Sequence, residues 1–289
     1  MMSSECALDE AVDAAPTVGV NNCYHHAIKR LARYRRRVML LRMQHLDLSR
    51  SCNHDVTAAG LGRLVIFSQL RRLEMRGMTL ETSFVFRVTT SLTHLHLIFC
   101  GHVVDADMSS LHHLQYLKLG GCTKLTRFHL SNISALTHLD ISFCRDMTDV
   151  SLISVSTLPQ LQRLALSNCG NITGSSLCHN ITTLTHLDVS DCKMVTDQGL
   201  SSLSTLVQLR RLNFIRCENI IGSCLCHLPM LTHLNVSGCK NITDAGLSGI
   251  STLSALLQLT LSGCWSITGS SLHNIPTLTH LRINGCGNV

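Results

Sequence analysis

A nine-residue segment recurs along the chain, and this repetition constrains the fold more than any other feature of the sequence. Five copies begin with Leu-Thr-His-Leu and end with Cys: LTHLHLIFC (92–100), LTHLDISFC (136–144), LTHLDVSDC (184–192), LTHLNVSGC (231–239) and LTHLRINGC (278–286). Related copies occupy 114–122, 161–169, 209–217 and 256–264, and two weaker ones occupy 43–52 and 70–78. The eleven end positions lie 22 to 26 residues apart. Such a period predicts an array of small stacked units instead of one globular core.

Each unit predicts one half-buried strand. In LTHLDVSDC, Leu187 and Val189 alternate with His186, Asp188 and Ser190, which is the period of two expected of a strand. One such unit cannot cover its own apolar side, so neighbouring units are expected to stack. The predicted fold class is therefore α/β: a curved, horseshoe-shaped solenoid with a parallel β-sheet on its concave face and short helices and turns on its convex face.

The connections between strands alternate in kind. Thr196 or Asp197 is the expected N-cap of a short helix that carries Leu200 and Leu203 inward. Units that open with Leu-Thr-His-Leu continue into longer helical stretches of this type. The intervening units continue into segments rich in Gly and Ser, which predict shorter turns.

The pattern L-x-x-L-x-L-x-x-C resembles the cysteine-containing class of leucine-rich repeats found in F-box-and-leucine-rich-repeat proteins. The resemblance extends past the cysteine into CRDMTDVSL (144–152), CKMVTDQGL (192–200) and CKNITDAGL (239–247), and it covers roughly residues 42–289. It implies a leucine-rich-repeat solenoid, and it makes a substrate-recognition subunit of a ubiquitin ligase one candidate function. Residues 1–41 contain no recognisable F-box.

Ten of the fifteen cysteines fill the same position of the repeat. They could form a metal array or a ladder of disulfides, or they could be small buried thiols that pack beside one another and donate weakly to a loop carbonyl. No pair of CxxC motifs is present, which favours the buried thiols. Free thiols in every unit, together with an N-terminus unlike a secretory signal, predict an intracellular, reducing compartment such as the cytoplasm.

Polar side chains on the concave face are the candidate binding residues, and we expect a non-catalytic scaffold for protein–protein interaction. This surface mixes both signs of charge, offers little aromatic anchoring, and places Arg163 and Arg211 near Asp140 and Asp188, which they are expected to neutralise in part. The expected partner-binding residues are His138, Asp140, Arg163, His186, Asp188, Arg211, Asn213, His233 and Asn235.

The histidines of this surface do not predict a metal or catalytic site. Strands in a sheet lie about 4.8 Å apart, so histidines of alternate units, roughly 10 Å apart, cannot share one zinc ion, whose ligands lie at about 2.0 Å. No nucleophile is directed at a His–Asp pair, and no nucleotide-binding motif is present. We therefore predict no enzyme activity, no cofactor and no small-molecule substrate.

The chain divides into three parts. Residues 1–21 form an acidic tail that is expected to be disordered or ordered by a partner, and residues 43–289 hold eleven repeats, the last of them incomplete. Residues 22–42 predict a basic amphipathic helix, which could cap the first repeat, contact RNA or dock into a large complex, or lie on a membrane surface. Its candidate polyanion contacts are Lys29, Arg30, Arg33, Arg36 and Arg37. No run of apolar residues is long enough to span a membrane.

Overall fold

The computed structural model describes residues 42–49, 68–77, 90–101, 103, 106–177, 181–273 and 275–287. The predicted acidic tail and almost all of the predicted basic helix, with its five candidate polyanion contacts, lie outside the described residues and stay predictions.

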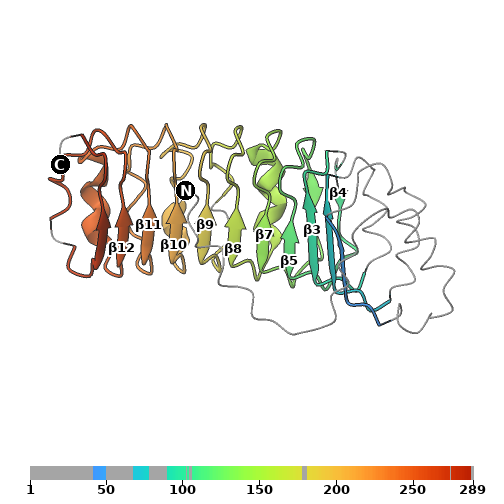
Figure 1. Ribbon diagram of the computed structural model, residues 1–289. Coiled ribbons are helices and arrows are strands. Elements are labelled where there is room, and N and C mark those ends of the chain that lie inside the picture. The colour runs from blue at the N-terminus through green and yellow to red at the C-terminus, as the bar shows by residue number, and fades with distance from the viewer. Residues whose placement is uncertain are drawn as a thin grey trace.

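Eleven parallel strands, one from each repeated segment, form a single sheet whose strand order follows the chain. Figure 1 shows the labelled strands from β3 to β12 side by side as one row of arrows. The bounds are β1 His45–Leu48, β2 Arg72–Arg76, β3 His94–Ile98, β5 Tyr116–Lys118, β7 His138–Asp140, β8 Arg163–Ala165, β9 His186–Asp188, β10 Arg211–Asn213, β11 His233–Asn235, β12 Gln258–Thr260 and β13 His280–Arg282. Two further strands, β4 Ala106–Asp107 and β6 Phe128–His129, pair with each other in a second parallel sheet.

From β7 to β12 the outer connections alternate as predicted, whereas the Leu-Thr-His-Leu unit of β3 continues into the short strand β4 and no helix is found in the described residues that follow it. Three helices, η2 Asp149–Thr157, η3 Leu203–Thr205 and η4 Gly246–Thr252, follow the strands β7, β9 and β11 of Leu-Thr-His-Leu units. All three are 3-10 helices, because their inward leucines and aliphatics recur every third residue, as a helix with three residues per turn requires. Leu200, Leu203 and Leu206 show this spacing and are buried, and the amides of Leu203 and Leu206 donate to the carbonyls of Leu200 and Leu203, three residues earlier.

The leucine side chains of each coil are buried by contact with the coils before and after it. Leu187 of β9 and Leu259 of β12 are 2% and 1% exposed, and both have a coil on each side. Leu281 occupies the same position in β13, where no described coil follows, and it is 42% exposed. Stacking therefore removes this side chain from water, which is worth about 2 kcal/mol for a leucine.

The cysteines at the end of each repeat form a ladder of buried thiols. All eleven cysteines among the described residues are free, which confirms the packing interpretation for them. Each ladder thiol from Cys122 onward donates to a backbone carbonyl of the preceding coil, as Cys192 Sγ does to Leu166 O at 3.1 Å. Burial raises the pKa of Cys192 to about 11 and that of Cys144 to about 12, so these groups stay neutral.

Of the two predicted N-cap residues, Thr196 does cap the turn that follows it, because its Oγ1 accepts from Gly199 N at 3.0 Å, whereas the prediction for Asp197 is wrong. Its carboxylate accepts hydrogen bonds from the next coil instead, from the backbone amides of Ile221 at 2.7 Å, Gly222 at 3.0 Å and Cys224 at 2.9 Å. The helix begins only at Leu203, because the residues before it form turns. The Asp of the Thr-Asp pair thus accepts hydrogen bonds from the backbone of the following unit.

Asp149 and Asp244 make the same connection one repeat pair before and one after Asp197. The Asp149 carboxylate accepts from Thr173 N at 2.9 Å, Thr173 Oγ1 at 2.8 Å and Gly174 N at 3.0 Å. Gly174 has a φ of 100°, a conformation that a residue with a Cβ rarely adopts, and this turns its amide toward the carboxylate. Asp149, Asp197 and Asp244 are referred to below as the carboxylate clamps.

The first prediction tests the stacking. Leu187→Asp should lower the free energy of unfolding by about 4 kcal/mol or more, because it buries an unpaired carboxylate in the core. His186→Ala, on the opposite side of the same strand, should change it by no more than about 0.5 kcal/mol. Urea denaturation of both variants measures the difference, and equal losses would mean that the two faces of β9 are assigned wrongly.

The second prediction concerns the clamps. Burial alone would raise the pKa of Asp149, but the hydrogen bonds from Thr173, Ser176 and Gly174 outweigh it and hold the pKa below its ordinary value. Asp149→Asn should therefore cost about 1 kcal/mol of stability near neutral pH, a figure kept small because the group is partly exposed. Because the pKa is lowered by folding, this contribution should disappear as the pH falls below about 4.

Asp146→Asn is the matched control, since Asp146 is exposed in the turn just before the helix. Denaturation series at several pH values compare the two variants with the wild type. A cost at Asp149 that did not change with pH would show that the amide geometry of the turn, and not the carboxylate charge, carries the stability.

Candidate functional site

The sheet carries two rows of polar side chains on the face opposite the core. The first row holds the residue at the start of each strand: His45, Arg72, His94, Tyr116, His138, Arg163, His186, Arg211, His233, Gln258 and His280. The second row holds the residue two positions later: Asp47, Glu74, His96, Lys118, Asp140, Ala165, Asp188, Asn213, Asn235, Thr260 and Arg282. Strand register places the members of each row directly beside one another.

All nine predicted partner-binding residues lie together in these two rows, on the five consecutive strands from β7 to β11. In the first row the order across the sheet is His138, Arg163, His186, Arg211 and His233. The two arginines are exposed, and the three histidines are half-buried. The structure thus assembles one surface from residues up to 97 positions apart in the sequence.

In the Leu-Thr-His-Leu units, the threonine before the first-row histidine fixes the tautomer of the imidazole ring. Thr185 Oγ1 donates to the carbonyl of Gln162 in the preceding coil at 2.9 Å and lies 2.8 Å from His186 Nδ1. A hydroxyl has one hydrogen, so Nδ1 must donate to Thr185 Oγ1, which leaves Nε2 as an acceptor. The same arrangement occurs at His94, His138, His233 and His280.

His186 is held in its neutral form. Burial, and after it the charges of Arg163 and Arg211 on the two adjacent strands, together lower its pKa to about 4. His138 and His233 add smaller effects of the same sign. At physiological pH the first row from β7 to β11 therefore gains no positive charge from His186, and its fixed cations are the two arginines.

Two acids of the second row have partners on strands or turns that the sequence analysis did not name. Asp140 forms an ion pair with Lys118 Nζ at 2.7 Å, on the neighbouring strand β5. Asp188 accepts a hydrogen bond from Asn213 Nδ2 at 3.4 Å and one from Ser190 N at 2.9 Å. Lys118, a member of the second row on the adjacent strand, is thus a partner of Asp140 that the sequence analysis did not name.

An aromatic stack lies on the same face, although the sequence predicted little aromatic anchoring. Tyr116 is stacked between His94 and His138, with ring centroids 5.8 Å and 5.4 Å apart and interplanar angles of 14° and 19°. His96 lies 4.9 Å from the Tyr116 ring at a tilted angle. The signal was present in the sequence, since Tyr116 occupies the position between two histidines of the first row.

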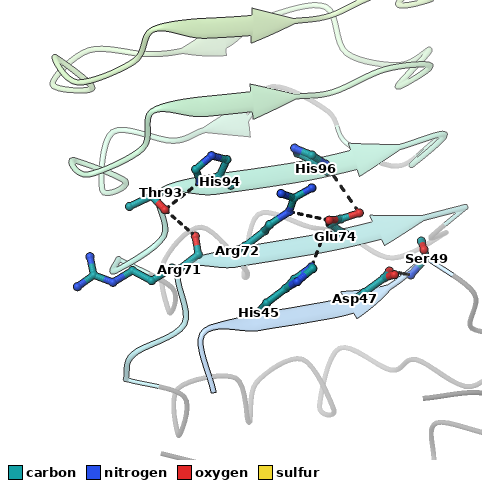
Figure 2. A network of polar contacts seen from close by, with 9 residues as sticks. All are labelled: His45, Asp47, Ser49, Arg71, Arg72, Glu74, Thr93, His94 and His96. Carbon is teal, nitrogen blue, oxygen red and sulfur yellow. Dashed lines mark hydrogen bonds and ion pairs between the residues drawn. The ribbon is translucent and has the colours of Figure 1, made fainter. Parts of the chain in front are cut away.

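On β1 to β3, at the N-terminal end of the sheet, the carboxylate of one acid lies near three basic side chains. Figure 2 shows Glu74 at the centre of this cluster. Its carboxylate lies 2.7 Å from Arg72 Nε, 3.2 Å from His45 Nε2 and 3.9 Å from His96 Nδ1. The Arg72 cation is therefore paired with Glu74 within the two rows.

The site offers a surface more than a pocket. Within the described part of the chain, no three His, Cys, Asp or Glu side chains are placed to hold a metal ion together. An open groove runs along the edge where β8 to β10 begin, lined by Pro159, Gln160, Gln162, Thr183, Thr185 and Gln208. None of the helices in the described ranges has the length and apolar character needed to cross a bilayer.

Comparison with known proteins agrees with this geometry. A family model described as "Leucine Rich repeat" matches residues 134–156, 180–204 and 227–251, each of which includes a Leu-Thr-His-Leu unit or its continuation. The crystal structure of an internalin, InlF, from Listeria monocytogenes is 16% identical, covers 90% of this chain and 88% of its own, and superposes with a TM-score of 0.50. The fold of this chain is a leucine-rich-repeat solenoid.

A second similar structure is the functional domain of InlJ from Listeria monocytogenes, described as including a cysteine ladder. It is 19% identical, with coverage of 86% of this chain and 65% of that chain and a TM-score of 0.43. No curated protein matches the sequence. The family model and the InlF structure identify the repeats and the fold, and neither carries the resemblance to F-box-and-leucine-rich-repeat proteins.

The third prediction tests the electrostatics of this leucine-rich-repeat surface. In the double variant Arg163→Gln/Arg211→Gln, the pKa of His186 should rise from about 4 toward its ordinary value, because two of the charges that oppose protonation are gone. A titration followed by the NMR signal of the His186 imidazole measures the shift. Arg127→Gln/Arg145→Gln removes the same charge from exposed positions outside the two rows and should leave this pKa unchanged. An unchanged value in the first variant would mean that burial alone sets it.

Proposed function

We propose that this protein is a non-catalytic scaffold that binds a protein partner on the sheet face, through the two rows of β7 to β11. Leucine-rich repeats typically mediate protein–protein interaction, and their extended sheet surfaces suit this role. The observation that carries the proposal is the continuous in-register surface, on which nine polar side chains from five strands lie side by side.

The rigidity of this surface supports binding. The backbone of each coil is tied to its neighbours by the sheet and the cysteine ladder, and the histidines are held by their threonines. A surface organised before binding loses less conformational entropy in the complex. Eleven strands at about 4.8 Å span roughly 48 Å, which exceeds the width that an ordinary interface of about 800 Å² per partner needs.

A reducing compartment such as the cytoplasm is part of the proposal. Nine ladder thiols, from Cys100 to Cys286, are free in the described chain, and an oxidising compartment would expose them to disulfide exchange during folding. Roles as the substrate-recognition subunit of a ubiquitin ligase, or as a complex subunit that docks through residues 24–42, stay predictions from the sequence, since no observation on the described residues favours them.

The fourth prediction separates the two faces of the solenoid. Asn213→Arg/Asn235→Arg places two large side chains in the second row, and Val150→Arg/Ile153→Arg places two on the outer helix, where the native residues are 65% and 59% exposed. Proteins retained from a cell lysate by the wild type and the outer-face variant should be lost by the sheet-face variant. A partner identified in this way and purified should bind the sheet-face variant at least about 30-fold more weakly, as expected for central interface residues.

Melting temperatures of both variants serve as the folding control. A partner that bound the sheet-face variant as well as the wild type, and was lost by the outer-face variant, would place the interaction on the helical side and contradict the proposal.

A further inference from the structure

We propose that a hollow at the edge of the sheet where β2, β3 and β5 begin is a second binding site, which takes the phosphoryl group of a phosphorylated serine or threonine on a protein. The hollow lies outside the two rows of β7 to β11, so this inference goes beyond the proposed function and does not depend on it.

The lining of this hollow is basic and rich in hydroxyl groups. The hollow measures about 510 Å³, and no acid is among the described residues that line it: Arg71, Thr90, Ser91, Ser110, His112 and His113. These residues come from the three consecutive coils of β2, β3 and β5. Stacking of the coils therefore gathers one guanidinium and two imidazoles that are far apart in the sequence.

The three basic side chains are accessible to a ligand. Arg71, His112 and His113 are exposed, and no carboxylate of the described residues lies within ion-pairing distance of them. Figure 2 shows the Arg71 side chain directed away from Glu74 at the start of β2. His112 Nδ1 donates to the carbonyl of Asn132 at 3.4 Å, which leaves Nε2 as the second hydrogen-bonding atom of this ring.

Short hydroxyl side chains create the hollow. Ser91, just before the Leu-Thr-His-Leu segment of β3, donates its Oγ hydrogen to Leu70 O of the preceding coil at 2.8 Å. Thr183 does the same before β9, where its Oγ1 donates to Leu161 O at 2.7 Å. Because these short side chains are bonded back to the preceding coil, they leave a space between the longer side chains of the two flanking coils.

The groove where β8 to β10 begin is the neutral counterpart of this hollow. It has nearly the same size, about 490 Å³, and it also spans three consecutive coils. Gln162 stands at the repeat position of Arg71, and Gln208 stands at that of His113. The space thus follows from the repeat, and the residues of the flanking coils decide whether it is charged.

A phosphoryl group matches the basic lining. Its oxygens are strong hydrogen-bond acceptors and carry between about 1.5 and 2 negative charges at neutral pH. An arginine fork donates to two such oxygens at once, and imidazoles supply further N–H donors. A carboxylate carries one charge, which a single arginine compensates, whereas the hollow brings three basic groups together. Arginine-containing clusters of this kind recognise phosphorylated motifs in proteins.

The rest of this edge favours one isolated phosphoryl group over a polyanion. The residues that immediately precede the other ten strands of the sheet include one charged side chain, Arg210: Gln44, Thr93, Gln115, Thr137, Gln162, Thr185, Arg210, Thr232, Leu257 and Thr279. A nucleic acid with one phosphate in the hollow would place its following phosphates against uncharged groups. No Phe, Tyr or Trp is among the described residues that line the hollow, so a base would find no ring on which to stack.

The test uses two ten-residue peptides of Gly and Ala that differ only at one central residue, phosphoserine or serine. Binding to the full chain is measured by fluorescence anisotropy and NMR titration at low salt. The phosphorylated peptide should bind at least about tenfold more tightly, as expected for charge-assisted hydrogen bonds to one phosphoryl group. It should shift the imidazole signals of His112 and His113 and leave the side-chain amides of Gln162 and Gln208 unchanged.

A loss variant gives the basic hollow the residues of its neutral counterpart. Arg71→Gln/His113→Gln should abolish the preference for the phosphorylated peptide. Arg210→Gln/His129→Gln removes the same residue types from exposed positions outside the hollow and should keep the preference. Melting temperatures of both variants confirm that they are folded.

A gain variant keeps the experiment informative if the loss variant is less stable. Gln162→Arg/Val207→His/Gln208→His places an arginine and two histidines at the same repeat positions beside β8 to β10. It should bind about two phosphorylated peptides per chain where the wild type binds one, and unfolding cannot produce this result.

Equal binding of the two peptides by the wild type, or a preference that survives Arg71→Gln/His113→Gln, would overturn the inference. Inorganic phosphate bound as tightly as the phosphorylated peptide would show a site for a free ion and would overturn it too. So would tighter binding of a ten-nucleotide single-stranded RNA with the same dependence on Arg71. Each of these results leaves the proposed function standing, because that function is decided by the sheet-face and outer-face variants.

Discussion

Contact between neighbouring coils is the interaction on which the rest of the structure depends. A single coil has one apolar side and no second layer of its own, so its leucines are removed from water only by the coil before and the coil after. The difference between Leu259, which has both neighbours, and Leu281, which has one described neighbour, shows this directly. Stability is therefore spread along the array as a sum of similar interfaces.

Polar contacts between coils make this stacking specific. A parallel array could slip in register if only leucines held it together, but the cysteine thiols, the threonine hydroxyls and the carboxylate clamps each reach a backbone group of an adjacent coil. They satisfy amides and carbonyls at the turns, where the sheet cannot, and an unsatisfied buried group would be costly. The same contacts hold the backbone beneath the two rows in one position.

Sequence patterns predicted the features that depend on the residues of a single coil. They missed contacts that form between the side chains or backbones of two coils. Leu187, Val189 and the ladder cysteines follow from alternation and spacing, and the alternation of long and short connections was readable from the Gly and Ser content. Asp197 was misassigned because its partners, Ile221 to Cys224, lie about one unit away and are recognised only once the register is known. The Tyr116 stack and the pair of Asp140 with Lys118 were missed for the same reason, since both join adjacent strands.

The two kinds of unit contribute different kinds of residue to the first row of the sheet face. Every described Leu-Thr-His-Leu unit places in the first row a histidine that is bonded to its own threonine, so alternate strands present an imidazole held in the same way. The intervening units have no such constraint, and their first-row residues are Tyr116, Arg163, Arg211 and Gln258. In these units the first-row side chain thus varies only at every second strand, and these strands lie about 10 Å apart. A partner that binds this face must place its contacts at the same interval of about 10 Å. This interval is a property of the repeat pair and not of any single residue.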